Sequence, residues 1–380
     1  MLIAGLMTGT SLDGIDVAVC DVDAEGVTLQ SFATHPYTEH TLDLVSRALR
    51  GEASTVELCD LPFALSADYA AAIPKDVALD AIGIHGQTIW HNPPHSTWQA
   101  ASGSALATLT GVPVVSDFRA ADVAVGGQGA PLVPIFDWLT LHSTEIDRVA
   151  LNIGGMANIT LLPRNAQLET LRAFDTGPGN ILIDSAVMQT FGKRYDEGGS
   201  IASAGRPLVA MLEHVKGLPF FALEPPKSTG RELFNDAFVT ELHRRFLHPS
   251  GPSEDFVTTL TELVAWSIAD HIHRMQANTE ELVCSGGGVH NEYLMQRIAF
   301  HLPDVRVVTS DTFGIPADAK EAMCFAYLAW LTLHGIPGNV PTVTGASRRV
   351  VLGSISDPRI SSVNAPKVSS VSASTLRPRA

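Results

Sequence analysis

Residues 1–22 read M-L-I-A-G-L-M-T-G-T-S-L-D-G-I-D-V-A-V-C-D-V, a pattern typical of two strands joined by a polar turn. The expected strands are the apolar runs Leu2–Leu6 and Ile15–Val22. The small polar residues between them are Thr8, Gly9, Thr10, Ser11, Asp13 and Gly14. Glycines leave backbone N–H groups accessible to phosphate oxygens and the hydroxyl groups add donors, so the turn is a candidate phosphate-binding hairpin. An ordinary β-hairpin is the alternative, and the turn is neither a Walker A loop nor a dinucleotide-binding G-x-G-x-x-G.

The composition is that of a globular protein large enough for two domains. The chain has 380 residues, of which 45% are hydrophobic and 17% charged. A net charge of −15 argues against a general affinity for nucleic acid or for anionic membrane surfaces. We find no apolar signal or membrane-spanning run, and we therefore expect a cytoplasmic protein. The cysteines are far apart and form no C-x-x-C pair, so we expect reduced core residues at Cys20, Cys59, Cys284 and Cys324.

A second stretch repeats the strand–turn–strand pattern of the opening. Arg148–Pro163 reads R-V-A-L-N-I-G-G-M-A-N-I-T-L-L-P, with glycines again between two apolar runs. Two hairpins that each begin one half of the chain predict a duplicated α/β architecture of two domains with a cleft between them, although chance similarity is the alternative. The expected domains are residues 1–128 and 129–356, followed by a disordered tail at 357–380.

Alternating strand and helix patterns support this class. We expect strands at Leu2–Leu6, Ile15–Val22, Ala81–Ile84, Val112–Val115, Arg148–Ile153, Ile159–Leu162, Glu281–Cys284 and Val305–Val308. We expect helices at Thr41–Leu49, Leu61–Ala72, Gly103–Gly111, Gly179–Phe191, Leu208–Val215, Leu233–Phe246, Thr258–Ala277, Glu292–His301 and Ala319–His334.

Two further stretches contain candidate site residues. In A-F-D-T-G-P-G-N, residues 173–180, Asp175 ends an apolar run before a Gly177–Gly179 turn and a helix, so its carboxylate is a candidate general base. A turn or N-cap role is the alternative. In S-G-G-G-V-H-N, residues 285–291, three glycines between a strand and a helix would let a flat group such as adenosine approach the backbone. A bare glycine-rich turn explains them equally well.

Isolated histidine, arginine and glutamate residues complete the candidates. His85, His91 and His95 are spaced by six and four residues and interrupted by prolines, which disfavours a zinc site; His85 instead follows a strand, where α/β sheets bind ligands. Arg119 follows V-V-S-D-F and could hold a carboxylate or phosphate, although an ion pair with Asp117 is the commoner outcome. The same choice applies to Lys227 and Arg231, and Glu321 begins the last strongly apolar helix.

Ten motifs, in order, resemble those of the anhydro-N-acetylmuramic acid kinases of bacterial peptidoglycan recycling. They are G-L-M-T-G-T-S-L-D-G-I-D, H-G-Q-T-I-W-H, V-V-S-D-F-R, G-G-Q-G-A-P-L-V-P, L-N-I-G-G-M-A-N-I-T, F-D-T-G-P-G-N, P-P-K-S-T-G-R-E-L-F-N, S-G-G-G-V-H-N, A-K-E-A-M-C-F-A and P-T-V-T-G-A. The resemblance covers Leu2 to about Gly353. It implies the two-domain actin-like fold shared with sugar kinases, with ATP and Mg²⁺ in the interdomain cleft and no metal ligand assigned.

The resemblance also implies roles for individual residues. The first phosphate-binding hairpin would comprise Gly9, Thr10, Ser11, Leu12, Asp13, Gly14, Ile15 and Asp16. The second would use Asn152, Gly154, Gly155 and Asn158, and the adenosine-side turn would use Gly286, Gly287 and Gly288. Asp175 matches the family's base, which takes a proton from the water that opens the anhydro bridge while the departing oxygen attacks the γ-phosphorus. His85, Arg119 and Glu321 are the candidates for holding the sugar, with Arg119 facing its lactyl carboxylate.

The sequence departs from the family pattern in one segment and leaves alternatives. At residues 98–105, W-Q-A-A-S-G-S-A, the family usually has Q-I-G followed by an acidic or amide residue, so the resemblance assigns no sugar contact there. Another sugar or carboxylate kinase of the same fold is one alternative, and an actin-like nucleotide switch is another. The sequence leaves open whether the protein is a homodimer.

Overall fold

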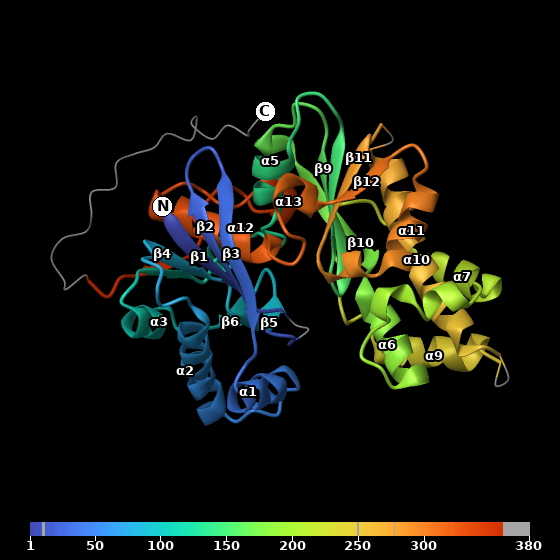
Figure 1. Cartoon of the computed structure of the whole chain (residues 1–380), viewed down its shortest axis with the longest axis horizontal. Helices are drawn as coiled ribbons and strands as arrows, with labels where there is room; N and C mark the ends of the chain where they lie inside the picture. Colours follow the sequence, from blue (N-terminus) through green and yellow to red (C-terminus); the bar gives the residue numbers. More distant parts are fainter. Residues whose placement is uncertain (10–11, 249–250, 277, 360–380) are drawn as a thin grey trace. The chain divides into compact units, whose positions relative to one another are not determined.

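The computed structural model describes residues 1–9, 12–248, 251–276 and 278–359, and it divides into two compact units (Figure 1). The first unit contains residues 1–140, 168–170 and 319 onward; the second contains 141–167 and 171–318. This division differs from the expected boundaries at 128 and 356. The reason is that the helix α12 (Lys320–Leu333) returns to the sheet of the first unit, where it packs on the strand β1 (Leu2–Met7). A Cβ atom on Gly5 would lie 1.9 Å from the carbonyl oxygen of Ala322, so only glycine permits this contact.

The first unit is built on a six-stranded sheet in the order β13-β7-β4-β1-β2-β3. Besides β1, its strands are β2 (Ile15–Val22), β3 (Val27–His35), β4 (Ala81–Ile84), β7 (Val114–Ser116) and β13 (Ser354–Ser356). Its remaining elements are α1 (Glu39–Leu49), α2 (Thr55–Ala72), the β5–β6 hairpin (Gln87–Asn92 and Ser96–Ala100), α3 (Gly103–Thr110), α4 (Ala120–Ala124), α5 (Pro134–Leu141) and α13 (Pro341–Thr344). Strands β1 and β2 pair antiparallel, whereas β1 and β4 pair parallel.

The second unit is built on a five-stranded sheet in the order β10-β9-β8-β11-β12. These strands are β8 (Arg148–Ile153), β9 (Met156–Leu162), β10 (Arg172–Pro178), β11 (Glu281–Ser285) and β12 (Arg306–Thr309). Its helices are α6 (Asn180–Phe191), α7 (Val209–Lys216), α8 (Pro219–Ala222), α9 (Asp236–Phe246), α10 (Ser253–Met275) and α11 (Glu292–His301).

The two sheets share one topology. In each, a meander of three antiparallel strands, β3-β2-β1 or β10-β9-β8, continues into two parallel strands, β4-β7 or β11-β12. The hairpins predicted from the sequence begin the two repeats. The predicted duplication and the α/β class are therefore confirmed, and the repeat cannot be a chance likeness of two turns.

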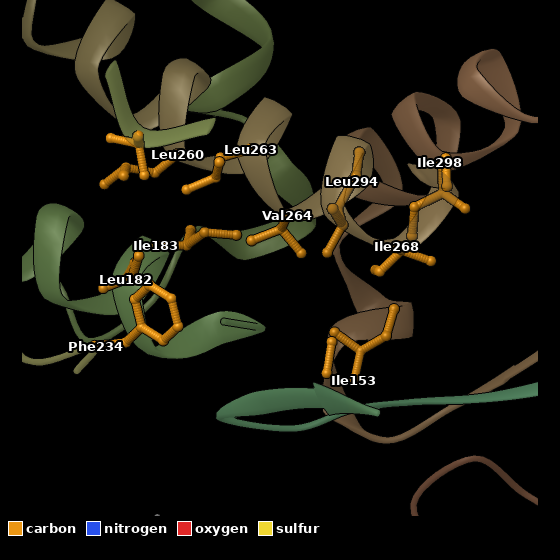
Figure 2. Packing of buried hydrophobic residues seen from close by; sticks show 14 of the residues in the cluster. Ile153, Leu182, Ile183, Phe234, Leu260, Leu263, Val264, Ile268, Leu294 and Ile298 are labelled. Atoms are coloured by element: carbon orange, nitrogen blue, oxygen red, sulfur yellow. The ribbon is translucent and has the colours of Figure 1, made fainter. Parts of the chain in front are cut away.

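The core of the second unit is formed by apolar side chains from its sheet and helices. Figure 2 shows Ile153 of β8 together with residues of α6, α10 and α11, namely Leu182, Ile183, Leu260, Leu263, Val264, Ile268, Leu294 and Ile298. Helix α10 is buried along most of its length, and the hydroxyl groups of Thr258, Thr259 and Thr261 donate to the carbonyl oxygens four residues earlier. These threonines can be buried because their hydroxyl groups are satisfied within the helix.

Two local expectations require correction. Helix α2 begins at Thr55, six residues before the predicted Leu61, because Ser54 and Glu57 form a reciprocal capping box. The cysteines are all free, but Cys59 is exposed on α2 rather than in the core, whereas Cys20, Cys284 and Cys324 are buried. Of the tail expected to be disordered, residues 360–380 lie outside the described residues.

Candidate functional site

The turn between β1 and β2 contains the first group of predicted site residues, of which Thr10 and Ser11 lie outside the described residues. Asp13 is exposed and Asp16 is half-buried, with its Oδ1 atom accepting a hydrogen bond of 2.6 Å from the hydroxyl group of Thr34. A Cβ atom on Gly14 would lie 2.5 Å from Thr34 Cγ2. Gly14 is therefore needed for packing against β3, and the fully buried Ile15 belongs to the core.

A buried polar group lies against this turn. The Nε2 atom of Gln87 donates to the carbonyl oxygen of Gly9 at 3.3 Å, and its Oε1 atom accepts from the hydroxyl group of Tyr37 at 3.1 Å. The hydroxyl groups of Thr8 and Tyr69 lie 3.0 Å apart. Gln87 was not among the predicted site residues, although it lies in the H-G-Q-T motif directly after β4. It fixes the backbone of the turn at Gly9.

The predicted sugar-binding residues of the first unit form one cluster. The guanidinium group of Arg119 donates to His85 Nε2 at 3.0 and 2.8 Å and to the carbonyl oxygen of Gly129 at 2.7 Å. Burial, together with the positive charge of Arg119, holds the pKa of His85 well below its ordinary value, so the imidazole is a neutral acceptor. Its ring lies 4.8 Å from that of Phe325. Glu321, in the first turn of α12, interacts electrostatically with Arg119, and burial raises its pKa.

The ion pair weighed for Arg119 and Asp117 is not formed among the residues that the structure describes. The atypical segment 98–105 lies beside the cluster. A Cβ atom on Gly86, whose φ is +80°, would lie 3.2 Å from the Cβ atom of Ala101. The alanines of this segment thus pack directly against the residue that follows His85.

Asp122 supports this cluster and was not predicted from the sequence. Its fully buried carboxylate accepts hydrogen bonds from the backbone of Gly129 at 2.8 Å, from Asn339 at 2.7 Å and from the hydroxyl group of Thr344 at 2.8 Å. Because Gly129 in turn accepts from Arg119, Asp122 fixes the loop that orients the guanidinium group. Its side-chain partners Asn339 and Thr344 are 217 and 222 residues away in the chain, so no local pattern reveals the role.

In the second unit, four polar residues lie in one row across the sheet. The register pairs Asp175 with Asn158, Asn158 with Asn152, and Asn152 with Ser285. Side chains of directly paired residues project from the same face of a sheet. The candidate base and both asparagines of the predicted second hairpin therefore share a face. Neither asparagine makes a side-chain hydrogen bond within the described part of the chain.

The glycine turns of the second unit are packed together. Gly286, at φ +80°, follows β11, and a Cβ atom there would lie 2.7 Å from Asn152 Oδ1. A Cβ atom on Gly288 would lie 2.3 Å from Ile153 Cγ2, whereas one on Gly287 would meet nothing within 4 Å. The predicted adenosine-side turn thus contacts the predicted phosphate-binding hairpin, and only glycine permits the contact.

The turn at Gly154 and Gly155 is tied to the start of α6. The backbone N–H groups of Gly179 and Asn180 donate to the carbonyl oxygens of Gly155 and Gly154, each at 2.8 Å. The N–H group of Ile181 also donates to Gly155 at 3.2 Å. The first N–H groups of α6 are therefore used to position the hairpin.

Asp175 lies within β10 rather than at its end, which corrects the expected Gly177–Gly179 turn. The strand continues to Pro178, with a bulge between Asp175 and Gly177. The Oδ2 atom of Asp175 accepts a hydrogen bond from the backbone N–H group of Thr229 at 2.9 Å. Burial raises the pKa of Asp175 to about 6, partly offset by the Thr229 hydrogen bond. A carboxylate with this pKa is ionised at neutral pH and still basic enough to accept a proton.

The described ranges contain neither a metal-binding cluster nor a membrane-spanning helix. No three His, Cys, Asp or Glu side chains gather closely enough there to form a metal-binding group. None of the helices in these ranges has the length and apolar character needed to cross a membrane.

The duplicated topology, with a glycine turn in the first hairpin of each repeat, defines the class of actin-like α/β proteins. Residues 1–358 match the family described as anhydro-N-acetylmuramic acid kinase, and the chain belongs to this family. It is 40% identical over 385 residues to the anhydro-N-acetylmuramic acid kinase of Bacillus cereus, covering 95% of this chain and 100% of the relative. It is 42% identical to that of Saccharophagus degradans, covering 94% and 99%. Among solved structures, the activator of 2-hydroxyisocaproyl-CoA dehydratase from Clostridium difficile matches with a TM-score of 0.45 and 13% identity, covering 87% of this chain and 94% of its own.

Proposed function

We propose that this protein opens 1,6-anhydro-N-acetylmuramic acid with water and phosphorylates the released sixth hydroxyl group with ATP, forming N-acetylmuramic acid 6-phosphate in peptidoglycan recycling. Membership of the kinase family over residues 1–358 supports the substrate. The observation that carries the mechanism is the position of Asp175, held in a polar row with Asn158 and Asn152 beside the glycine turns.

ATP is proposed to contact the glycine turns of both repeats, with its adenosine against Gly286, Gly287 and Gly288. The open approach to Gly287 and the exposed Gly155 support this role, because backbone N–H groups without a nearby side chain can reach a ligand. Mg²⁺ would neutralise charge on the phosphates. Asp13 and Asp16 fit it as carboxylate partners, since Mg²⁺ prefers oxygen ligands and binds through one or two carboxylates plus phosphates.

Asp175 is proposed to act as the general base. It removes a proton from the water molecule that attacks the anomeric carbon, and the bond from this carbon to the bridging oxygen breaks. The released oxygen forms a bond to the γ-phosphorus while the bond from this phosphorus to ADP breaks. Phosphoryl transfer depends mainly on alignment and charge neutralisation. The Thr229 N–H group, at 2.9 Å from Oδ2, orients the carboxylate for the first step.

The cluster in the first unit is proposed to bind the sugar. Three of the five N–H groups of Arg119 are engaged by His85 and Gly129, so two remain for the lactyl carboxylate of the muramic acid. Glu321 would accept from a sugar hydroxyl or amide group. This arrangement accounts for binding of an anionic sugar by a protein whose net charge is −15.

The test is incubation of the protein with ATP, Mg²⁺ and the anhydro-sugar, followed by mass spectrometry of the sugar. The expected product is heavier than the substrate by one water and one phosphoryl group. Phosphorylation of a different sugar, with the anhydro-sugar unchanged, would instead identify another kinase of this fold. ATP hydrolysis that does not depend on any sugar would identify a nucleotide switch.

A further inference from the structure

The loop of residues 225–229, P-P-K-S-T, holds Asp175 from two sides. The backbone N–H group of Asp175 donates to the carbonyl oxygen of Lys227 at 3.2 Å, and the N–H group of Thr229 donates to the carboxylate at 2.9 Å. In both hydrogen bonds the partner of Asp175 is a backbone group of the loop. The position of the carboxylate therefore depends on how firmly this loop is held.

The side chain of Lys227 fastens the loop to two helices. Its ammonium group donates to the carbonyl oxygen of Phe220 in α8 at 3.0 Å and to Nε2 of His271 in α10 at 2.6 Å. It also lies 4.4 Å from the centre of the Phe220 ring. A lysine that only solubilised a loop would extend into water, whereas this one is directed into the unit.

His271 is arranged as a neutral acceptor for the ammonium group. It is fully buried, and its Nδ1–H group donates to the carbonyl oxygen of Ser267 at 2.6 Å, which leaves Nε2 with a lone pair. Burial lowers the pKa of His271 to about 4, so the ring carries no charge at neutral pH. The contact with Lys227 is therefore a directional hydrogen bond.

Lys227 keeps a positive charge near Asp175 at neutral pH. Burial, followed by the charge of Arg274, lowers the pKa of Lys227 to about 8. The acidic groups that act on it are Asp270, Glu224 and Asp175. Of these, Asp270 forms a 2.9 Å ion pair with Arg274. The positive charge of Lys227 in turn lowers the pKa of Asp175, opposing burial and the negative charge of Glu232.

We propose that Lys227 and His271 form a positioning pair for the base. The pair fixes the 225–229 loop against α8 and α10, and the ammonium group supplies the positive charge that favours the ionised carboxylate of Asp175. This inference rests on the proposed function, because it assumes that Asp175 accepts a proton during turnover. Neither residue of the pair needs to touch the sugar or ATP.

The experiment measures kcat, KM and the pH dependence of kcat in Lys227→Met, Lys227→Arg and His271→Gln, with ATP affinity measured by calorimetry. Lys227→Met should lower kcat roughly 10- to 100-fold, because a misplacement of about 1 Å can cost a factor of about 10². It should also move the acidic limb of the profile to higher pH, because loss of a nearby positive charge raises the pKa of a carboxylate. ATP affinity should not change.

The other variants separate charge from position. Lys227→Arg keeps the positive charge, so its acidic limb should stay close to that of the wild type. His271→Gln keeps the charge on Lys227 but alters its acceptor, so kcat should fall while the acidic limb stays in place. The matched control is Lys193→Met, which removes one positive charge from an exposed position in the same unit and should match the wild type.

Each outcome supports or overturns the pair. A Lys227→Met enzyme with wild-type kcat and an unmoved acidic limb overturns it. A lower kcat with an unmoved limb refutes the electrostatic role, since loss of packing alone would give that result. If circular dichroism shows that Lys227→Met does not fold, His271→Gln decides, and a wild-type kcat there overturns the pair. Failure of the proposed function is separate: Asp175→Asn would then turn over normally, or the wild type would not convert the anhydro-sugar.

Discussion

Replacing Asp175 with asparagine should stabilise the second unit against unfolding and remove most of the protein's turnover. Burial raises the pKa of this carboxylate from an ordinary value of 3.8 to about 6. The negative charge of Asp175 therefore lowers the free energy of unfolding at neutral pH. A shift of about two units corresponds to about 3 kcal/mol. Asparagine occupies nearly the same volume and its Oδ1 atom can still accept from Thr229 N–H. We therefore expect a gain of about 1–3 kcal/mol in the free energy of unfolding at pH 8.

The pH dependence of this gain identifies its cause. Because the folded pKa is raised, protonation of Asp175 stabilises the wild type fully below pH 3.8, and this contribution is lost as the pH rises through about 6. The advantage of Asp175→Asn should thus be absent near pH 4, grow between about 4 and 6, and be constant above that range. Urea unfolding at a series of pH values measures it.

Asp184 provides a matched control. It lies in α6 of the same unit, and burial, with the negative charge of Asp196, raises its pKa to about 6 as well. Asp184→Asn should therefore be stabilised in the same pH range but retain normal turnover. An Asp175→Asn protein that is less stable than the wild type at pH 8, or equally stabilised at pH 4 and pH 8, would refute the reasoning.

One change of pH and two sets of substitutions test the site further. The value of kcat should fall as the pH drops through about 6, because protonated Asp175 cannot accept a proton. A kcat that does not change between pH 5 and pH 8 would contradict this prediction. Gly286→Ala should destabilise the protein by at least about 1 kcal/mol in urea unfolding and weaken ATP binding. The reason is that the φ of Gly286 is +80° and the added methyl group would lie 2.7 Å from a side-chain oxygen. The control Gly287→Ala should lose less stability, because the space around Gly287 is open. Arg119→Lys should raise KM for the anhydro-sugar roughly tenfold or more and leave the affinity for ATP unchanged. An ammonium group cannot donate to His85, Gly129 and a carboxylate in the same fork geometry. An unchanged KM would exclude the contact between Arg119 and the sugar carboxylate.

The sequence predicts the features that depend on neighbouring residues. Apolar runs on either side of glycine turns predicted both hairpins, and their similarity predicted the duplicated topology. The prediction that Asp175 lies at the end of a strand was wrong, because it assumed that Gly-Pro-Gly forms a turn. In the folded protein β10 is an edge strand, which tolerates proline, and pairing with β9 extends it to Pro178.

The support of the site depends on contacts between distant residues and could not be predicted. Gln87 holds the carbonyl group of Gly9 from 78 positions away, and Asp122 binds Asn339 across 217 positions. The domain boundary was missed for the same reason, because α12 returns to the first sheet after the second unit is complete. Such partners are fixed by tertiary packing rather than by periodicity.

The most direct test of the central claim compares the turnover of Asp175→Asn with its affinity for ATP. If this carboxylate is the base, the variant should bind ATP as tightly as the wild type and lose at least about two orders of magnitude in kcat for conversion of the anhydro-sugar. Near-normal turnover in a folded Asp175→Asn protein would contradict the account.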